Sequence, residues 1–334
     1  MVTIIMGCEF SNALASFSDL ECDTNEATLG SAGANGYIYS NNPDSGLEAA
    51  TYYPVGLANA ILDRDLYPND SDIIAEFSRD LGDSDCLPST SWYYGFGILS
   101  DRSRQTGFTS VLLHEMTHGL GFVSLVDPID GTKPSGVNDV FSKNLFDKTT
   151  GLSFNDAEET NQNRIDASVS VTGLLWSGAN TNAQAIGQLD AGFDDVNANG
   201  SFENGDKIQM YAPESLRTGS SVSHFNADAS PNELMEPSYT ETLYELGLAL
   251  YLLQDLGWPI VIEQQVNVDD TDFGDNDTIA LDLTTKQIDV PGNGNADDFQ
   301  YNLDYQGEDV TALLTSNDTG VSIALPESGA FAGT

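Results

Sequence analysis

The segment VLLHEMTHGLGF at residues 111–122 constrains the fold of this chain more than any other segment. Its pattern predicts a helix over residues 107–118 that is apolar on more than one side, with Phe108, Leu112 and Met116 in one stripe. Such a helix is buried in the body of a domain, and its one polar strip faces a cavity. The two glycines that follow predict a sharp reversal at its end, because glycine accepts the left-handed backbone conformation.

His114 and His118 lie four residues apart, so both imidazoles project from the same face of the predicted helix and reach one metal ion. Zinc is the ion that best suits a catalytic site of this kind. It lowers the pKa of a bound water from about 15.7 to near 7, and Glu115 beside it then completes the deprotonation and returns the proton to the departing amine. With only 3 histidines in 334 residues, such spacing arises by chance on the order of one time in a thousand.

The third ligand is not where the commonest continuation of this motif places it, because that position holds Ser124. The remaining histidine is His224, 106 residues beyond His118, and we expect it to complete the site from a distance. The alternative is a glutamate ligand, Glu158 or Glu159, although neither lies in the helical context that such a ligand requires.

The surroundings of His224 read GSSVSHFNADASPNELMEPSY. A histidine followed about ten residues later by a methionine in a tight polar turn is typical of the Met-turn, a hydrophobic floor beneath the metal. Met235 occupies that position, and Pro237 stiffens the turn.

Together these segments resemble the leishmanolysin-like branch of the metzincin zinc peptidases, including secreted bacterial proteins of the same layout. The resemblance covers about residues 2–260 and rests on HEMTHGLGF, SHFNADASPNELMEP, LQDLGW, ATLGSAG, WYYGFG, IQMYAP and SSVSHF. In that family an insertion separates the glycine of the motif from the third histidine, which accounts for Ser124.

The resemblance implies zinc ligands His114, His118 and His224, with Glu115 as general acid and base. It also implies Met235 as the Met-turn residue. Some metzincins have a tyrosine after the Met-turn that supports the oxyanion. Tyr239 lies near that position at an offset that does not clearly match, so an ordinary packed tyrosine is the competing interpretation.

The fold class expected from the resemblance is α+β, with a metzincin-like peptidase domain over residues 1–262. Residues 123–220 are rich in Gly, Asn, Asp and Thr, and we expect an insertion without a separate core. Residues 263–334 alternate short apolar runs with polar turns, which predicts a partial β-sandwich-like module.

Three further segments give local expectations. Residues 53–62 predict a helix, residues 91–99 predict a strand, and residues 72–81 fit either. A second long helix is expected within TETLYELGLALYLLQDLGW, with Ser238 and Glu241 as a capping box, and a stop at Gly257 and Pro259. The stripe expected to be buried consists of Leu243, Leu246, Leu250 and Leu253.

The net charge of −41 excludes nucleic acid and anionic lipid surfaces as partners, and no apolar run is long enough to span a membrane. We expect a monomer that acts on proteins or peptides. The start, MVTIIMGCEFS, lacks the features of a signal peptide, so we expect a truncated or mature form of a secreted protein. Of Cys8, Cys22 and Cys86 at most two pair within the chain, and the sequence leaves the pairing open.

A calcium loop is a further expectation, because oxygen-bearing side chains recur at alternating positions around a glycine in DDVNANGSFENGD. The last position carries Asp in place of the longer Glu, so a solvated loop is the competing interpretation. The acidic run at 269–277 fits a cation or a linker. The ligands that the loop would offer are Asp195, Asn197, Asn199, Ser201 and Asp206.

The function that these motifs favour is a secreted zinc endopeptidase, a hydrolase in which Glu115 activates water. The alternative is a calcium-dependent extracellular binding or adhesion protein on a degenerate protease scaffold, although an intact His, Glu, His and His set argues against decay. Amidohydrolysis of a non-protein substrate on the same zinc centre is a third hypothesis.

Overall fold

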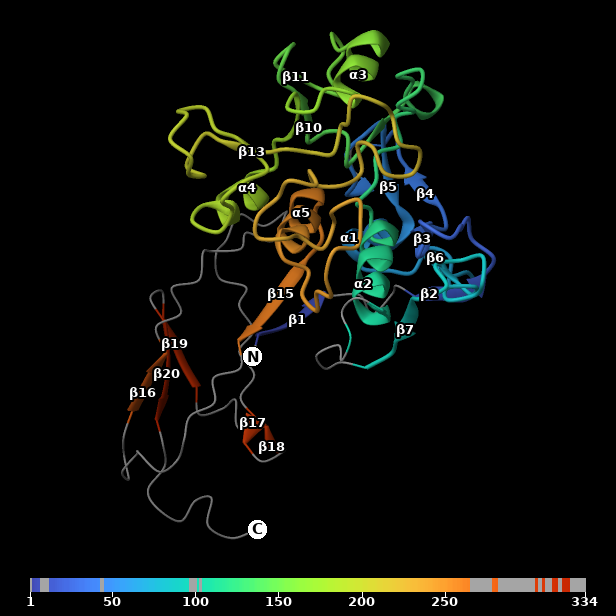
Figure 1. Cartoon of the computed structure of the whole chain (residues 1–334). Coiled ribbons are helices and arrows are strands. Elements are labelled where there is room, and N and C mark those ends of the chain that lie inside the picture. The colour runs from blue at the N-terminus through green and yellow to red at the C-terminus, as the bar shows by residue number, and fades with distance from the viewer. Residues whose placement is uncertain are drawn as a thin grey trace. The chain divides into compact units, whose positions relative to one another are not determined.

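The computed structural model describes residues 12–42, 45–95, 101 and 104–264, together with several short strands outside these ranges. The chain forms two compact units, one of residues 6–258 and one of residues 1–5 with 259–334. Short helices combine with small sheets, so the expected α+β class is confirmed (Figure 1). None of the helices in these ranges has the length and apolar character needed to cross a bilayer.

The larger unit contains a sheet in the order β2-β6-β3, formed by Ala13–Ser18, Ile73–Ser78 and Gly30–Ala34. β2 runs parallel to β6, and β3 runs antiparallel to it. The ambiguous segment 72–81 is therefore a strand. Its apolar residues at alternating positions are buried on one face, while Ile74 and Glu76 lie exposed on the other.

Helix α2, Phe108–Gly119, packs against β3 and β6, as Figure 1 shows. The apolar stripe expected from the sequence is the face that makes this contact, so that expectation is confirmed. The packed cluster consists of Ala75, Phe77 and Val111 with Leu29, Ala32, Trp92, Phe108, Leu112, Met116 and Tyr239 around them. The helix ends at Gly119, and Gly121 has the positive φ of 115° that the expected reversal requires.

A second sheet has the order β4-β5-β9, formed by Tyr37–Tyr39, Thr51–Pro54 and Asn138–Asp139. Helix α1, Val55–Leu62, begins directly after β5, which confirms most of the helix expected at 53–62.

The approach to α2 is a pair of parallel strands, β7 (Ser91–Tyr93) and β8 (Gln105–Gly107). The strand expected over 91–99 is confirmed at its first three residues, while residues 96–99 lie outside the described part of the chain. Because β8 runs directly into α2, its pairing with β7 fixes where the helix begins.

The segment 123–220 contains only short elements but shares its core with the rest of the unit. Aromatic rings pack in a continuous chain from Phe225 to Phe122, Phe141 and Trp176. Besides β9, its elements are η2 (Pro134–Gly136), β10 (Leu145–Asp147), β11 (Leu152–Ser153), α3 (Asn161–Ser168), β12 (Leu174–Trp176), α4 (Ala179–Ala185), β13 (Phe193–Asp194) and β14 (Lys207–Ile208).

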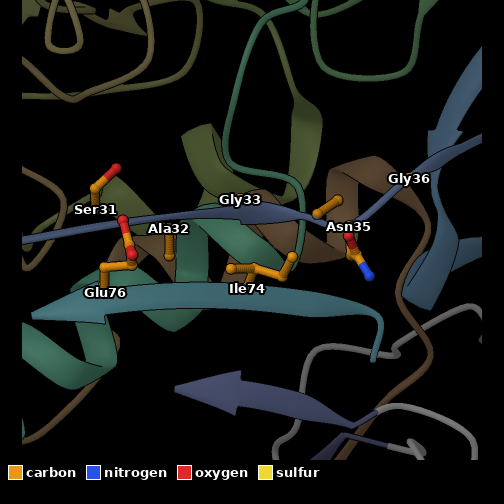
Figure 2. Close-up of a pocket in the computed structure, with 8 residues that line it drawn as sticks. Ser31, Ala32, Gly33, Asn35, Gly36, Ile74 and Glu76 are labelled. Atoms are coloured by element: carbon orange, nitrogen blue, oxygen red, sulfur yellow. The ribbon is translucent and has the colours of Figure 1, made fainter. Parts of the chain in front are cut away.

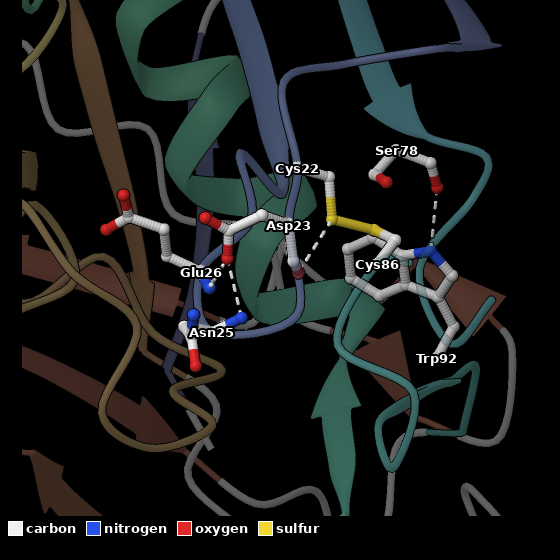
Figure 3. Close-up of a disulfide and its surroundings, with 7 residues drawn as sticks. All are labelled: Cys22, Asp23, Asn25, Glu26, Ser78, Cys86 and Trp92. Atoms are coloured by element: carbon white, nitrogen blue, oxygen red, sulfur yellow. Dashed lines mark hydrogen bonds between the residues drawn. A yellow bond between two sulfur atoms is a disulfide. The ribbon is translucent and has the colours of Figure 1, made fainter. Parts of the chain in front are cut away.

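A disulfide joins Cys22 to Cys86, with the two Cα atoms 5.2 Å apart, and so closes the pairing question for these two residues (Figure 3). It links the loop after β2 to the loop after β6. Nearby, the Trp92 indole donates to the Ser78 carbonyl at 2.9 Å, which holds β7 against the end of β6. Cys8 lies outside the described residues.

The second long helix is shorter than the sequence predicts. Helix α5 spans Leu248–Leu256, and its N-cap is Gly247 with φ 55°, so the capping box at Ser238 and Glu241 is wrong. The cap is instead tertiary, because the carboxylate of Glu233 accepts the N–H of Leu248 at 2.8 Å. Gly257, at φ 105°, ends the helix as expected.

The smaller unit pairs β1 (Val2–Met6) with β15 (Ile260–Gln264). A three-stranded antiparallel sheet has the order β16-β20-β19, and a short hairpin joins β17 to β18. The acidic run at 269–277 lies outside the described residues. The bounds of these strands are Thr278–Leu281 for β16, Asp304–Tyr305 for β17, Glu308–Asp309 for β18, Leu314–Asn317 for β19 and Gly320–Ala324 for β20.

The Glu233 cap makes stability depend on pH. Burial raises the pKa of Glu233 from 4.5 to about 7, so the folded chain holds this proton more tightly than the unfolded chain. The stabilisation of the folded chain by protonated Glu233 is therefore complete below pH 4.5, and it is lost as the pH rises through 7. A Glu233→Gln variant keeps an oxygen that accepts the Leu248 N–H but carries no charge. Wild type loses stability over this pH range and the variant does not. We therefore expect the free energy of unfolding of the variant minus that of wild type to increase by up to about 3 kcal/mol between pH 4.5 and 8.

Urea denaturation of both proteins across this pH range measures the difference. A difference that does not change with pH would contradict the assignment of this cap to a buried carboxylate.

Candidate metal centre

Three histidine rings converge in the larger unit. His114 and His118 project from α2, and His224 comes from a loop more than 100 residues later in the chain. The three Nε2 atoms are each 3.2 Å from the other two. Among the described residues, these side chains form the group of three potential metal ligands that lies close enough to hold one ion.

Backbone carbonyls fix the orientation of all three rings. Nδ1 of His114 lies 2.7 Å from the carbonyl oxygen of Leu234, and that of His118 lies 2.7 Å from the carbonyl oxygen of Phe122. Nδ1 of His224 lies 2.7 Å from the Ser220 carbonyl. A carbonyl only accepts, so each Nδ1 carries the proton and each Nε2 presents a lone pair to the centre of the cluster.

The electrostatics of the cluster keep the rings neutral. Burial lowers the pKa of His114, and burial followed by the charge of His114 lowers the pKa of His118 to about 3. Burial, His118 and His114 together lower the pKa of His224 well below its usual value. Neutral imidazole is the form that coordinates a metal, so no proton has to leave before an ion enters at neutral pH.

The geometry of the cluster fits zinc. Two nitrogens 3.2 Å apart, each about 2.05 Å from one ion, subtend an angle of about 103° at that ion, close to the tetrahedral value of about 109°. Three lone pairs that face one another at this distance repel, since none of the Nε2 atoms carries a proton to share. A cation at the centre relieves that repulsion, and three protein nitrogens leave one tetrahedral position open.

Met235 lies in the turn that touches the cluster from the other side. Its side chain is fully buried, and its carbonyl accepts the N–H of Phe225, the residue after His224. The preceding residue, Leu234, supplies the carbonyl bound to His114. The turn thus joins one histidine on α2 to the loop of the third histidine.

Glu115 is buried beside the histidines, and β3 contacts it. The backbone N–H of Ala32 donates to its carboxylate, while burial raises the pKa of Glu115 to about 8. A Cβ atom at Gly30 would lie 2.7 Å from Cγ of Glu115, so the helix and strand approach this closely only because residue 30 is glycine.

β3 is the edge strand of its sheet, and α2 packs on the face of the sheet that carries Ala32 and Ala75. Hydrogen bonds from Ser78 to Leu29 and from Asn35 to Asp72 set the register with β6. By alternation, the backbone groups of Gly30, Ala32 and Ala34 point away from β6. In the sequence, ATLGSAG carries only a part of the metzincin resemblance. The available signal was the run of small residues, which leaves room for another backbone or side chain.

A shallow pocket lies along the same strand but on the opposite face of the sheet (Figure 2). The exposed side chains of Ile74 and Glu76 border it beside Ser31, whereas α2 packs on the face of Ala32 and Ala75. The pocket is therefore separate from the histidine cluster.

Tyr239 does not reach the histidines. Its hydroxyl accepts the N–H of Gly107 at 3.0 Å and shares a hydrogen bond with Thr242 at 2.5 Å. Gly107 is the N-cap of α2, about two turns before His114. The contacts of Tyr239 are those of a packed residue that anchors the start of the helix.

The predicted calcium loop is closed by its own backbone. Asp195 accepts the N–H groups of Asn199 and Gly200, while Asp206 accepts those of Val196 and Glu203. The amides of Asn197 and Asn199 both donate to the Glu203 carboxylate, and the Asn199 side-chain oxygen accepts the Ser201 N–H. Calcium binding at this loop remains a prediction.

The glutamate alternatives for the third ligand have other surroundings. Glu159 is buried and accepts the Thr150 hydroxyl at 2.9 Å, and Glu158 is exposed. Neither belongs to the group that His224 completes.

Comparison with protein-family models, with curated proteins and with solved structures gives no match for this chain.

Replacing His224 by alanine removes one of the three converging nitrogens. We expect the zinc affinity to fall by more than the roughly 10- to 100-fold typical of losing a hydrogen-bond partner of a ligand. Zinc per chain is measured by mass spectrometry after dialysis, and the metal-free forms of both proteins are compared by circular dichroism as a control for folding. Equal zinc occupancy in the two proteins would remove His224 from the centre.

Proposed function

We propose that this protein is a zinc-dependent endopeptidase, with His114, His118 and His224 as ligands. The convergence of three neutral imidazoles, each locked by a backbone carbonyl, carries the proposal. Such a set binds zinc and leaves an open position, as catalytic zinc sites require, whereas structural zinc sites are closed by four protein ligands. When bound, zinc supplies Lewis-acid polarisation of a carbonyl and acidification of water.

Glu115 is the residue that we propose to move the proton. It neighbours His114 on α2, and the Ala32 N–H fixes its carboxylate from the opposite side. A general base must be held within hydrogen-bond reach of the proton that it takes, and the contact with β3 supplies that restraint. Its burial favours a carboxyl group that both accepts and returns a proton near neutral pH.

The outer edge of β3 supports a peptide as the substrate. The outward backbone groups of Gly30 and Ala34 and the carbonyl of Ala32 suit an extended chain that adds to the sheet as a further strand, while the Ala32 N–H is already bound to Glu115. Because Glu115 reaches this edge, a peptide bound along it would pass beside the proposed base.

The metzincin resemblance and the extracellular location belong to the same proposal. The buried Met235, its contact with the His224 loop, and the long segment between the histidines are consistent with the leishmanolysin-like layout. The Cys22–Cys86 disulfide favours an oxidising compartment outside the cytosol.

Replacing Glu115 by Gln tests the assigned base. The amide is nearly isosteric and cannot take a proton, so we expect zinc content to stay at the wild-type level while casein hydrolysis falls by about 100-fold or more. Wild type that binds zinc but cleaves no peptide at any calcium or salt concentration would favour the alternative of a binding protein.

Replacing Gly30 by Ala tests the contact between β3 and Glu115. The new methyl would press on the Glu115 side chain, so we expect kcat for casein or a fluorogenic peptide to fall roughly 10- to 100-fold with zinc retained. Gly33→Ala is the matched control, because it makes the same change on the same strand and its Cβ would meet nothing within 4 Å. Equal activity in the two variants would mean that Glu115 does not depend on the strand.

A further inference from the structure

A series of serine side chains joins the loop after α2 to the loop that carries His224. The N–H of Ser124 donates to Oγ of Ser223 at 3.0 Å, across 99 positions in the chain. Oγ of Ser124 lies 2.8 Å from Oγ of Ser142, which is fully buried. Ser142 in turn donates its N–H to the carboxylate of Asp139 at 2.8 Å.

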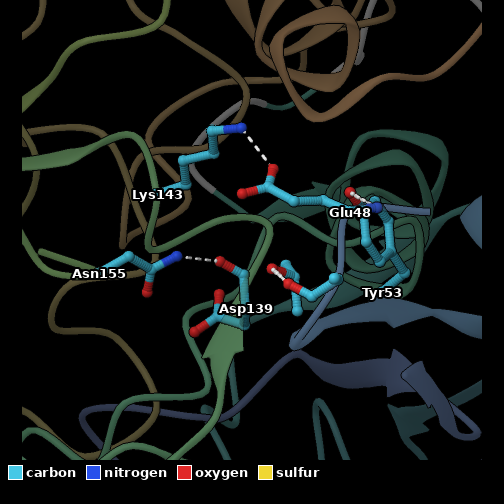
Figure 4. Close-up of polar contacts among 7 residues, drawn as sticks. Glu48, Tyr53, Asp139, Lys143 and Asn155 are labelled. Atoms are coloured by element: carbon cyan, nitrogen blue, oxygen red, sulfur yellow. Dashed lines mark hydrogen bonds and ion pairs between the residues drawn. The ribbon is translucent and has the colours of Figure 1, made fainter. Parts of the chain in front are cut away.

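The series ends on a rigid part of the fold. Asp139 belongs to β9, which pairs with β5, and its side chain is buried. The Asn155 amide donates to the backbone carbonyl of Asp139 at 2.7 Å, as Figure 4 shows. Burial raises the pKa of Asp139 to about 6, and its contacts with Ser142 oppose that shift. The series therefore runs from Ser124 through Ser142 to Asp139.

The bond between Ser124 and Ser223 is close to two of the histidines. Ser223 directly precedes His224, and Ser124 lies two residues after Phe122, whose carbonyl orients His118. In the described part of the chain, this is the one hydrogen bond between residues 119–126 and residues 219–226. Together with the contact between the Phe122 and Phe225 rings, it links the segment that orients His118 to the segment that carries His224.

We propose that Ser223 is a positioning residue for the metal centre, acting with Ser124, Ser142 and Asp139 to hold the His224 loop at its distance from α2. Ser124 occupies the position where the commoner form of the motif has its third ligand. In this chain the same position serves the site indirectly, by fixing the loop from which the third ligand comes. The inference rests on the proposed zinc function.

The test compares Ser223→Ala with Ser168→Ala. Ser168 is also buried and also makes one hydrogen bond, to the carbonyl of Arg164 at 2.7 Å, but it lies at the end of α3 outside the series. Both changes remove one buried hydroxyl. We expect the zinc dissociation constant to rise roughly tenfold in Ser223→Ala, in the range for lost partners of metal-bound residues, and to change less than about twofold in Ser168→Ala.

Zinc affinity is measured by competition with a chromogenic chelator, and the visible absorption of the cobalt-substituted proteins reports the ligand geometry. We expect the cobalt spectrum to change in Ser223→Ala and to return in Ser223→Thr, which keeps the hydroxyl. Wild-type affinity and spectrum in Ser223→Ala would overturn the positioning role. Wild type that binds neither zinc nor cobalt would instead overturn the proposed function.

Ser142→Ala is a second test, for the case in which Ser223→Ala does not fold. Ser142→Ala breaks the series one step further from the metal, and we expect a zinc dissociation constant about threefold above that of Ser168→Ala. If the two are equal, the series does not position the centre.

Discussion

Three hydrogen bonds from imidazole Nδ1 atoms to backbone carbonyls determine the arrangement of the histidine cluster. Two are local, since Phe122 and Ser220 each lie four residues from the histidine that they orient, and the third joins His114 to Leu234 across the chain. Together they turn three lone pairs toward one point, an arrangement with an electrostatic cost when no cation is present. With the proposed zinc ion bound, its binding and the stability of the fold would be coupled, because the ion would offset a repulsion that the backbone imposes.

The close approach of α2 and β3 makes a second contribution to the same centre. A helix packed on an edge strand usually leaves a row of side chains between the two backbones, but Gly30 and Ala32 allow the Glu115 carboxylate to reach the strand itself. The strand thereby restrains Glu115 through Ala32, and in the proposed function it also offers the outward backbone groups of Gly30 and Ala34 to a peptide. These roles require small residues, which is why the segment has little apolar pattern of its own.

The sequence predicted α2, its buried stripe and most of the helix that follows Pro54, because local periodicity determines these elements. It pointed to His224 mainly because no other histidine was available. It placed the start of α5 too early, since the cap comes from Glu233 and a tertiary contact leaves no local signal. The contacts of Tyr239 and the partner of Cys22 were equally inaccessible, because each depends on residues far apart in the chain.

The long interval between His118 and His224 explains why this centre needs a polar framework. When the third ligand follows within a few residues of the helix, the short chain between them limits where it goes. An interval of 106 residues imposes almost no limit, because the entropy of closing a loop depends only weakly on its length once the loop is long. Position must then come from tertiary bonds. Tyr211 donates to the His224 carbonyl, Ser220 orients its ring, and Ser223 receives the Ser124 N–H, so the framework supplies what the covalent chain does not.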